Sequence, residues 1–385
     1  MPDGREFDNA APVRQFPRLQ RILEKLRPLI AADTRNPGGD ESCLAELLEG
    51  ILRSLKPDGL IRQSVPKGSG PGAEMAAYVV AWWGRPRLLL NAHLDTVPFS
   101  DGWSGDPLEL GLREDRAVGL GTADTKGAIA AILTALGEVP PRDCAVLFSG
   151  DEEGGSACME AFLRNRPPEL ELLERAIVCE PTGCLVGTRH RGILSGEVEV
   201  RGEGGHSSLA DGLPAPIWEV SRVASALGAW GQSQRAHGPD GFPGLCLNLA
   251  EIRGGSAYNV VPSRAVLVFS LRPPPGVPNE TIQKEIESRV RQVSAGAAVH
   301  WISSQPSLST AEPQGFTPFL GEACQSPVDL AFWTEAALLE RAGIAAVVFG
   351  PGRIEQAHVA DEWVHYEQLE AATESFVHSL RSLQS

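Results

Sequence analysis

Residues 87–98 read Arg-Leu-Leu-Leu-Asn-Ala-His-Leu-Asp-Thr-Val-Pro, a short apolar run that ends in a histidine and an aspartate. Such a run is typical of a buried strand. His93 and Asp95 then lie at its carboxyl end, where open α/β sheets place their functional sites. A metal-binding histidine usually donates its second ring N–H to a carboxylate, a role that suits Asp95. The alternative is a surface histidine beside an acid.

Apolar runs and one-sided helical patterns alternate around this strand. Helices are predicted over 16–30, 41–55, 126–136 and 158–164, and strands over 76–83, 145–149 and 176–179. This alternation predicts an α/β domain with a mostly parallel sheet and helices on both faces. A helix over 327–341, a strand over 346–349 and a helix over 366–383 are expected to rejoin that sheet.

The pattern changes after Cys184. Strands are predicted over 193–201, 245–253, 265–272 and 299–303, and helices over 215–227 and 280–293. The order βαββαβ is that of a ferredoxin-like unit, which can fold by itself. We therefore expect an inserted domain over 186–303, with 1–185 and 304–385 forming the catalytic domain.

Composition excludes several classes of partner. The chain has 385 residues and a net charge of -15, which would repel nucleic acid and anionic membrane surfaces. Its seven cysteines include no Cys-x-x-Cys pair, which favours reduced thiols and a cytoplasmic location. Neither a signal peptide nor a long apolar span is apparent, so secretion and membrane insertion are not expected.

Further acids and a histidine follow other predicted strands or turns: Asp124, Glu152, Glu153, Glu180 and His358. Each has an ordinary alternative, such as a helix cap for Asp124 or a solvated acid pair for the two adjacent glutamates. Together they should converge on one sheet edge. Three carboxylates and a hydroxide would balance the charge of two zinc ions while the histidines stay neutral.

Six motifs, in order along nearly the whole chain, strengthen this interpretation. They are His-Leu-Asp-Thr-Val-Pro (93–98), Gly-x-x-Asp-x-Lys-Gly (121–127), Asp-Glu-Glu (151–153), Cys-Glu-Pro-Thr (179–182), Gly-Gly-His-Ser-Ser (204–208) and Gly-Pro-Gly-x-Ile-x-Gln-Ala-His-x-x-Asp-Glu (350–362). The chain resembles the acetylornithine deacetylase, succinyl-diaminopimelate desuccinylase and glutamate carboxypeptidase family. Residues 333–362 are similar to its acetylornithine and acetylcitrulline deacetylase branch in particular.

This resemblance implies two zinc ions, for which Co²⁺ or Mn²⁺ are suitable substitutes. The implied ligands are His93 and Glu180 for one ion, Glu153 and His358 for the other, and Asp124 as the bridge.

The resemblance also implies three features around the metals. Glu152 would be the general base, Asp95 would orient His93, and the peptide bond after Asp124 would be cis.

In the inserted domain the resemblance implies a homodimer in which His206 reaches the neighbouring subunit's site and stabilises the oxyanion. Asn259 and Arg272 are expected to bind substrate, with Arg272 pairing its α-carboxylate. The alternatives are an exposed loop histidine, a turn asparagine and a strand-end arginine.

The expected function is removal of the acetyl group from an N-acetyl-L-amino acid, of the acetylornithine type used in arginine biosynthesis. The segment 187–192, which contains Arg189 and Arg191, departs from the lysine-glycine pattern of ornithine-type members. Acetylcitrulline therefore stays open as the substrate, with Arg191 as a candidate contact. The sequence also leaves open a succinyl-diaminopimelate desuccinylase, a dipeptidase or glutamate carboxypeptidase, and, outside enzymes, an inactive binding relative.

Overall fold

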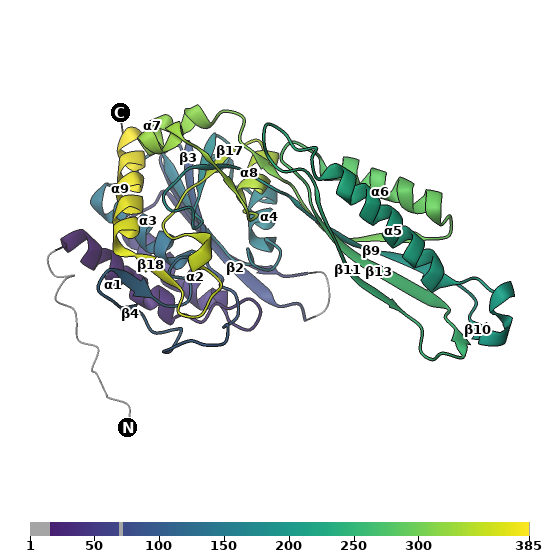
Figure 1. The fold of residues 1–385 in the computed structure, drawn as a ribbon. Helices are drawn as coiled ribbons and strands as arrows, with labels where there is room; N and C mark the ends of the chain where they lie inside the picture. Colours follow the sequence, from purple (N-terminus) through teal and green to yellow (C-terminus); the bar gives the residue numbers. More distant parts are fainter. Residues whose placement is uncertain (1–15, 69–71, 385) are drawn as a thin grey trace, which may run out of the picture. The chain divides into compact units, whose positions relative to one another are not determined.

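The computed structural model describes residues 16–68 and 72–384, which form two compact units drawn in Figure 1. The first unit comprises the chain up to Thr188, Thr310–Val328 and Thr334–Ser385, and the second comprises Arg189–Ser309 and Asp329–Trp333. Each unit has its own apolar core. In the described part of the chain, no helix is both long and apolar enough to cross a membrane.

The first unit is built on a mixed sheet whose four central strands are parallel. In spatial order the first six of its nine strands are β1 (Gly59–Pro66), β2 (Met75–Trp83), β6 (Cys144–Ser149), β3 (Leu88–His93), β7 (Arg175–Val178) and β17 (Ala345–Val348). Every residue of β3 and β6 is buried, as expected for strands covered on both faces. The antiparallel edge strand β1 had no counterpart among the predicted strands.

Helices cover both faces of this sheet, which confirms the predicted fold class. On one face α1 (Pro17–Ala31), α2 (Glu41–Ser54), α3 (Lys126–Glu138) and α9 (Tyr366–Ser382) share a core with Ala77 and Val79 of β2. Tyr78, between these two residues, contacts Phe162 of α4 (Ala157–Arg164) with ring centroids 6.3 Å apart. Because successive strand residues point to opposite faces, α4 lies on the other face.

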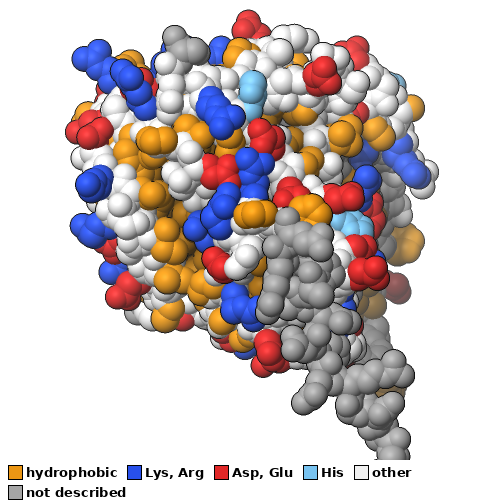
Figure 2. Space-filling model, turned by 90° about the vertical axis from the view of Figure 1, so that its left-hand side faces the viewer, with side chains coloured by type: hydrophobic (Ala, Val, Ile, Leu, Met, Phe, Trp, Pro, Cys, Tyr) orange, Lys and Arg blue, Asp and Glu red, His pale blue; other side chains and the backbone are white. Residues whose placement is uncertain are grey.

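Ion pairs tie the helices of the first face together at the surface. Arg18 of α1 binds Glu138 of α3 and Glu374 of α9, and Arg21 also pairs with Glu138. Figure 2 shows this side of the first unit, where acidic and basic side chains are intermingled. The net negative charge is therefore not gathered on this face.

The helix predicted over 327–341 is wrong in its first half. Residues Val328–Leu330 form strand β16, which pairs with β8 (Gly187–His190), and helix α8 covers only Ala336–Arg341. The main-chain N–H of Val328 donates to the carbonyl of Val186, 2.9 Å away. This hydrogen bond to a distant segment outweighs the local helical pattern.

Several short elements were also absent from the sequence predictions. They are a three-stranded antiparallel sheet of β18 (Trp363–His365), β5 (Arg116–Val118) and β4 (Gly111–Leu112), strand β15 (Leu308–Ser309) and helix α7 (Thr317–Leu320). Each has only two to four residues, which is too short for a periodic pattern, and β18 and β15 pair with strands more than 100 residues away in the sequence.

The second unit has a four-stranded antiparallel sheet in the order β11-β13-β9-β14. Along the chain its elements are β9 (Ile193–Arg201), α5 (Pro216–Gln234), β11 (Cys246–Gly254), β13 (Arg264–Arg272), α6 (Asn279–Val293) and β14 (Ala298–Gln305). Helices α5 and α6 contact each other, and both supply residues to this unit's core. The unit spans 189–309 where an inserted domain was expected over 186–303, and it includes 329–333 as well.

This unit has two distinct ends. At one end β9 begins, and Leu194 pairs with Leu271 beside Arg272. The nine residues of β9 extend about 26 Å at roughly 3.3 Å per residue. At the other end lies a small ladder of β10 (Gly205–His206) and β12 (Val260–Val261), visible at the tip of this unit in Figure 1.

Candidate metal centre

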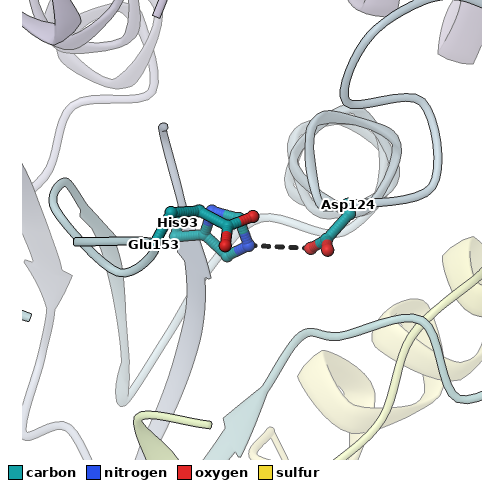
Figure 3. Close-up of side chains that lie close together, drawn as sticks. All are labelled: His93, Asp124 and Glu153. Atoms are coloured by element: carbon teal, nitrogen blue, oxygen red, sulfur yellow. Dashed lines mark hydrogen bonds and ion pairs between the residues drawn. The ribbon is translucent and has the colours of Figure 1, made fainter. Parts of the chain in front are cut away.

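Asp124 lies between two histidines that come from different parts of the first unit. Its Oδ1 is 2.9 Å from Nε2 of His93, the last residue of β3, and its Oδ2 is 3.2 Å from Nε2 of His358 (Figure 3 shows the first contact). Asp124 does not cap α3, because the N-cap residue of that helix is Thr125. One carboxylate thus offers each of its oxygens to a different imidazole, which is the arrangement of a bridging ligand.

Two glutamates complete the group around this carboxylate. Oε1 of Glu153 is 2.8 Å from Nε2 of His358, and Oε1 of Glu180 is 3.9 Å from Nε2 of His93. His93, Asp124 and Glu153 offer ligand atoms that all lie within 4.8 Å of one another. Imidazole nitrogens and carboxylate oxygens are the donors that zinc and similar divalent ions take in proteins. The donor set therefore fits the predicted metals.

The charges of this cluster also favour a cation. Burial, followed by the nearby Asp124 carboxylate, raises the pKa of Glu180 well above its usual value, and burial also raises the pKa of Glu153. Burial alone would lower the pKa of His93, but the acids around it raise that pKa. Carboxylates that disfavour one another's ionised form are stabilised as anions by a bound divalent ion.

His358 lies in a loop and has an uncommon backbone conformation. Its φ of 59° lies in the left-handed region, where residues other than glycine are rare. Its side chain is 44% exposed, whereas that of His93 is 2% exposed. Left-handed residues of this kind cluster at functional sites, where the surrounding structure fixes them.

Glu152 stands next to this cluster on the loop that follows β6. Burial raises the pKa of its carboxyl group well above the usual value, and repulsion from Glu153 acts in the same direction. A carboxyl group with a raised pKa can accept and return a proton near neutral pH.

Asp95 has contacts beyond the predicted one with His93. Nδ1 of His93 lies 2.9 Å from the main-chain oxygen of Asp95 and 3.6 Å from its carboxylate. A carbonyl orients a ligating histidine as well as a carboxylate does. The carboxylate itself accepts the main-chain N–H groups of Glu152 and Glu153, at 3.1 and 3.0 Å. Asp95 therefore fixes the loop that carries these two glutamates.

Asn36 is a residue of this site that the sequence did not reveal. Its side-chain N–H group donates to the carboxylates of Asp95 and Asp151, at 2.9 and 3.0 Å. It follows α1 in a segment whose only visible signal was the end of a helix. Both the Asn36–Pro37 and Asp124–Thr125 peptide bonds are cis, the second as the resemblance implied.

Glu362 is a second supporting residue. It ends the motif at 350–362, and the sequence predicted no role for it. Its carboxylate accepts three main-chain N–H groups, those of Gly121, Ala123 and Asp124, at 2.8 to 3.0 Å. Burial raises the pKa of this carboxyl group to about 7. Glu362 thereby holds the turn that presents Asp124.

In the second unit, two of the predicted residues lie together and two lie elsewhere. His206 and Asn259 share the β10–β12 end, where the Ser207 N–H donates to the carbonyl of Asn259, 3.0 Å away. Arg272 is exposed at the opposite end. Arg191 donates to the carbonyl of Gly244, at 3.0 Å.

The charge of Arg189, the other arginine of the segment 187–192, is neutralised within the second unit. Arg189 forms two hydrogen bonds with Asp329, at 2.7 and 2.8 Å. This pairing reduces the positive field that the segment 187–192 would otherwise present.

Comparison with known proteins identifies the family. The model of peptidase family M20/M25/M40 matches residues 89–382. N-acetyl-L-citrulline deacetylase of Xanthomonas campestris is 34% identical, over 93% of this chain and 96% of the relative. Acetylornithine deacetylase of Myxococcus xanthus is 33% identical, over 74% of this chain and 77% of the relative.

The fold agrees with these matches. A metallo-carboxypeptidase of family M20 from Sulfolobus solfataricus superimposes with a TM-score of 0.70 at 15% identity, over 94% of this chain and 99% of the other. The chain belongs to the peptidase family M20/M25/M40. With the side-chain cluster described above, it is a metal-dependent hydrolase.

Replacing Glu362 by glutamine should weaken metal binding. The amide nitrogen cannot accept a hydrogen bond, so one of the three main-chain N–H groups loses its partner and the turn that carries Asp124 loosens. We expect the apparent affinity for Zn²⁺ to fall about 10- to 100-fold, as for other residues that support metal ligands. Competition with a chromophoric chelator measures this affinity.

The matched control is Glu355→Gln, the same charge change at an exposed position on the same loop. Equal zinc affinity in the Glu362→Gln protein and the control would contradict the role of Glu362.

Proposed function

We propose that this protein is a two-metal deacetylase that hydrolyses the amide bond of an N-acetyl-L-amino acid, of the acetylornithine type that serves arginine biosynthesis. The observation that carries the proposal is the Asp124 carboxylate shared between His93 and His358, with Glu180 and Glu153 on either side. The names of the relatives support an acetylated amino acid as substrate. A cytoplasmic location suits such a biosynthetic enzyme.

We assign the metals as two Zn²⁺ ions, with Co²⁺ or Mn²⁺ as functional substitutes. His93 and Glu180 would hold one ion, His358 and Glu153 the other, and Asp124 both. When bound, such ions polarise the substrate carbonyl and make a water molecule easier to deprotonate.

The protein's own residues then move the proton. Glu152 takes a proton from the attacking water and returns it to the amide nitrogen, so that acetate and the free amino acid separate. Its raised pKa suits this double use, because the carboxyl group must hold the proton between the two steps. His206 would donate a hydrogen bond to the oxygen that becomes negative during attack.

We further propose that His206 acts in a homodimer, on the site of the other subunit, with the second unit as lid and dimerisation domain. The support comes from within the second unit. His206 lies at the end opposite Arg272, beyond the full length of β9, so the two residues cannot contact one small substrate from the same unit. A dimer resolves this by letting two chains complete each site.

Arg272 is the proposed partner of the substrate's α-carboxylate, because a planar guanidinium pairs with a carboxylate through two hydrogen bonds. Asn259, beside His206, is a proposed second contact. Acetylcitrulline is the second candidate substrate, favoured by the 34% identity with the citrulline enzyme. Arg189 pairs with Asp329. This pairing weakens the repulsion that Arg189 would exert on a cationic substrate side chain such as that of acetylornithine.

A substrate panel tests this function. We expect kcat/KM to be highest for N-acetyl-L-ornithine or N-acetyl-L-citrulline, and to fall by at least about 30-fold when the α-carboxylate is amidated, since an unpaired charge-assisted contact costs at least about 2 kcal/mol. A higher kcat/KM for succinyl-diaminopimelate or a glutamate-ending dipeptide would overturn the assignment.

The Glu152→Gln protein should retain its metal ions and lose most of its hydrolytic activity. We expect kcat to fall at least about 100-fold, the contribution of a general base, with metal content unchanged by elemental analysis. The contrasting variant is His358→Ala, which should lose one of the two ions. Near-normal turnover in metal-replete Glu152→Gln protein would refute the role of Glu152.

His206→Ala should lower kcat roughly 100- to 1,000-fold with little change in KM, because the histidine acts on the transition state. Mixing this variant with Glu152→Gln should restore activity. With random exchange half of the dimers are mixed and one of their two sites is intact, which gives about a quarter of the normal activity. Absence of recovery despite demonstrated subunit exchange would mean that His206 serves its own chain.

A further inference from the structure

The ring of His206 is held by the residue two positions later. His206 ends β10 and precedes the short 3-10 helix Ser207–Gly212. Its Nδ1 accepts the main-chain N–H of Ser208 at 3.2 Å and lies 2.8 Å from the Ser208 hydroxyl oxygen. The backbone on which this contact depends is itself anchored, because His206 pairs with Val260 and the Ser207 N–H donates to Asn259.

The main-chain and side-chain contacts of Ser208 together favour one position for the ring proton. An amide N–H can only donate, so Nδ1 must present its lone pair to Ser208. In a neutral imidazole the single proton then resides on Nε2. The Ser208 hydroxyl can donate to the same lone pair, which favours the same tautomer. The ring nitrogen that does not face Ser208 is therefore an N–H donor.

We propose that Ser208 is a positioning residue that holds His206 as the Nε2–H tautomer, so that the neutral ring offers a hydrogen-bond donor from this exposed end of the second unit. The use of that donor on a developing oxyanion rests on the proposed function, whereas the tautomer itself does not. The opposite tautomer would present a lone pair at Nε2, and a lone pair repels a negatively charged oxygen instead of stabilising it.

The test measures the tautomer directly, by nitrogen NMR of the full-length protein labelled with ¹⁵N in the histidine rings. The His206 signals are assigned by their loss in His206→Gln. At a pH where the ring is neutral, we expect Nδ1 to resonate as an unprotonated nitrogen and Nε2 as a protonated one. A protonated Nδ1 in the neutral ring would overturn the proposal, whatever the activity of the enzyme.

Variants at position 208 then connect the tautomer to turnover. Ser208→Thr keeps both donors and should keep the tautomer and kcat. Ser208→Asp replaces the hydroxyl by a carboxylate, which can only accept a hydrogen bond and competes with the main-chain N–H for Nδ1. Because this carboxylate attracts a proton to Nδ1, the Nδ1 signal should change to that of a protonated nitrogen. With the neutral tautomer reversed, kcat should fall at least about ten-fold while KM changes less than about two-fold, as for loss of a transition-state contact.

Ser207→Ala removes a neighbouring hydroxyl from the same exposed turn and should change neither the signals nor kcat. If Ser208→Asp reverses the tautomer and kcat is unchanged, Ser208 does not position His206 for catalysis. If the unmutated protein hydrolyses no N-acetyl amino acid, the proposed function fails, and the NMR result still decides the tautomer.

Discussion

The site depends on the electrostatic repulsion among buried carboxylates that surround Asp124. Glu153 and Glu180 each lie close to one histidine, and burial with mutual repulsion raises the pKa of both carboxyl groups. A protein does not gather such groups without a compensating charge, because an unpaired buried anion is costly. Two divalent cations would supply that charge, with Asp124, His93, Glu180, His358 and Glu153 as their ligands.

Two further carboxylates hold the main chain that presents these groups. Asp95 accepts the N–H groups of Glu152 and Glu153, and Glu362 accepts those of the turn before and at Asp124. These two loops are thus fixed through their backbones by acids from distant parts of the chain. Such support is what keeps metal ligands in place, because loops alone are mobile.

The sequence predicted the parts of the molecule that local patterns encode. The buried run that ends at His93 and the helical repeats identified the α/β sheet, and the family motifs supplied the five candidate ligands that the structure brings together. It did not predict β16, or that the carboxylate of Asp95 accepts the main-chain N–H groups of Glu152 and Glu153. Those features are hydrogen bonds between residues 57 to 142 positions apart, whose partners no local pattern reveals.

The second unit carries the remaining candidate residues. Its two ends carry different candidate residues, and a dimer allows both kinds to serve one substrate. Anomalous diffraction from crystals of the zinc-loaded protein tests whether Asp124 lies between two metal ions. We expect two peaks roughly 3.5 to 4 Å apart, both beside Asp124, one next to His93 and the other next to His358. A single peak, or peaks away from Asp124, would contradict it.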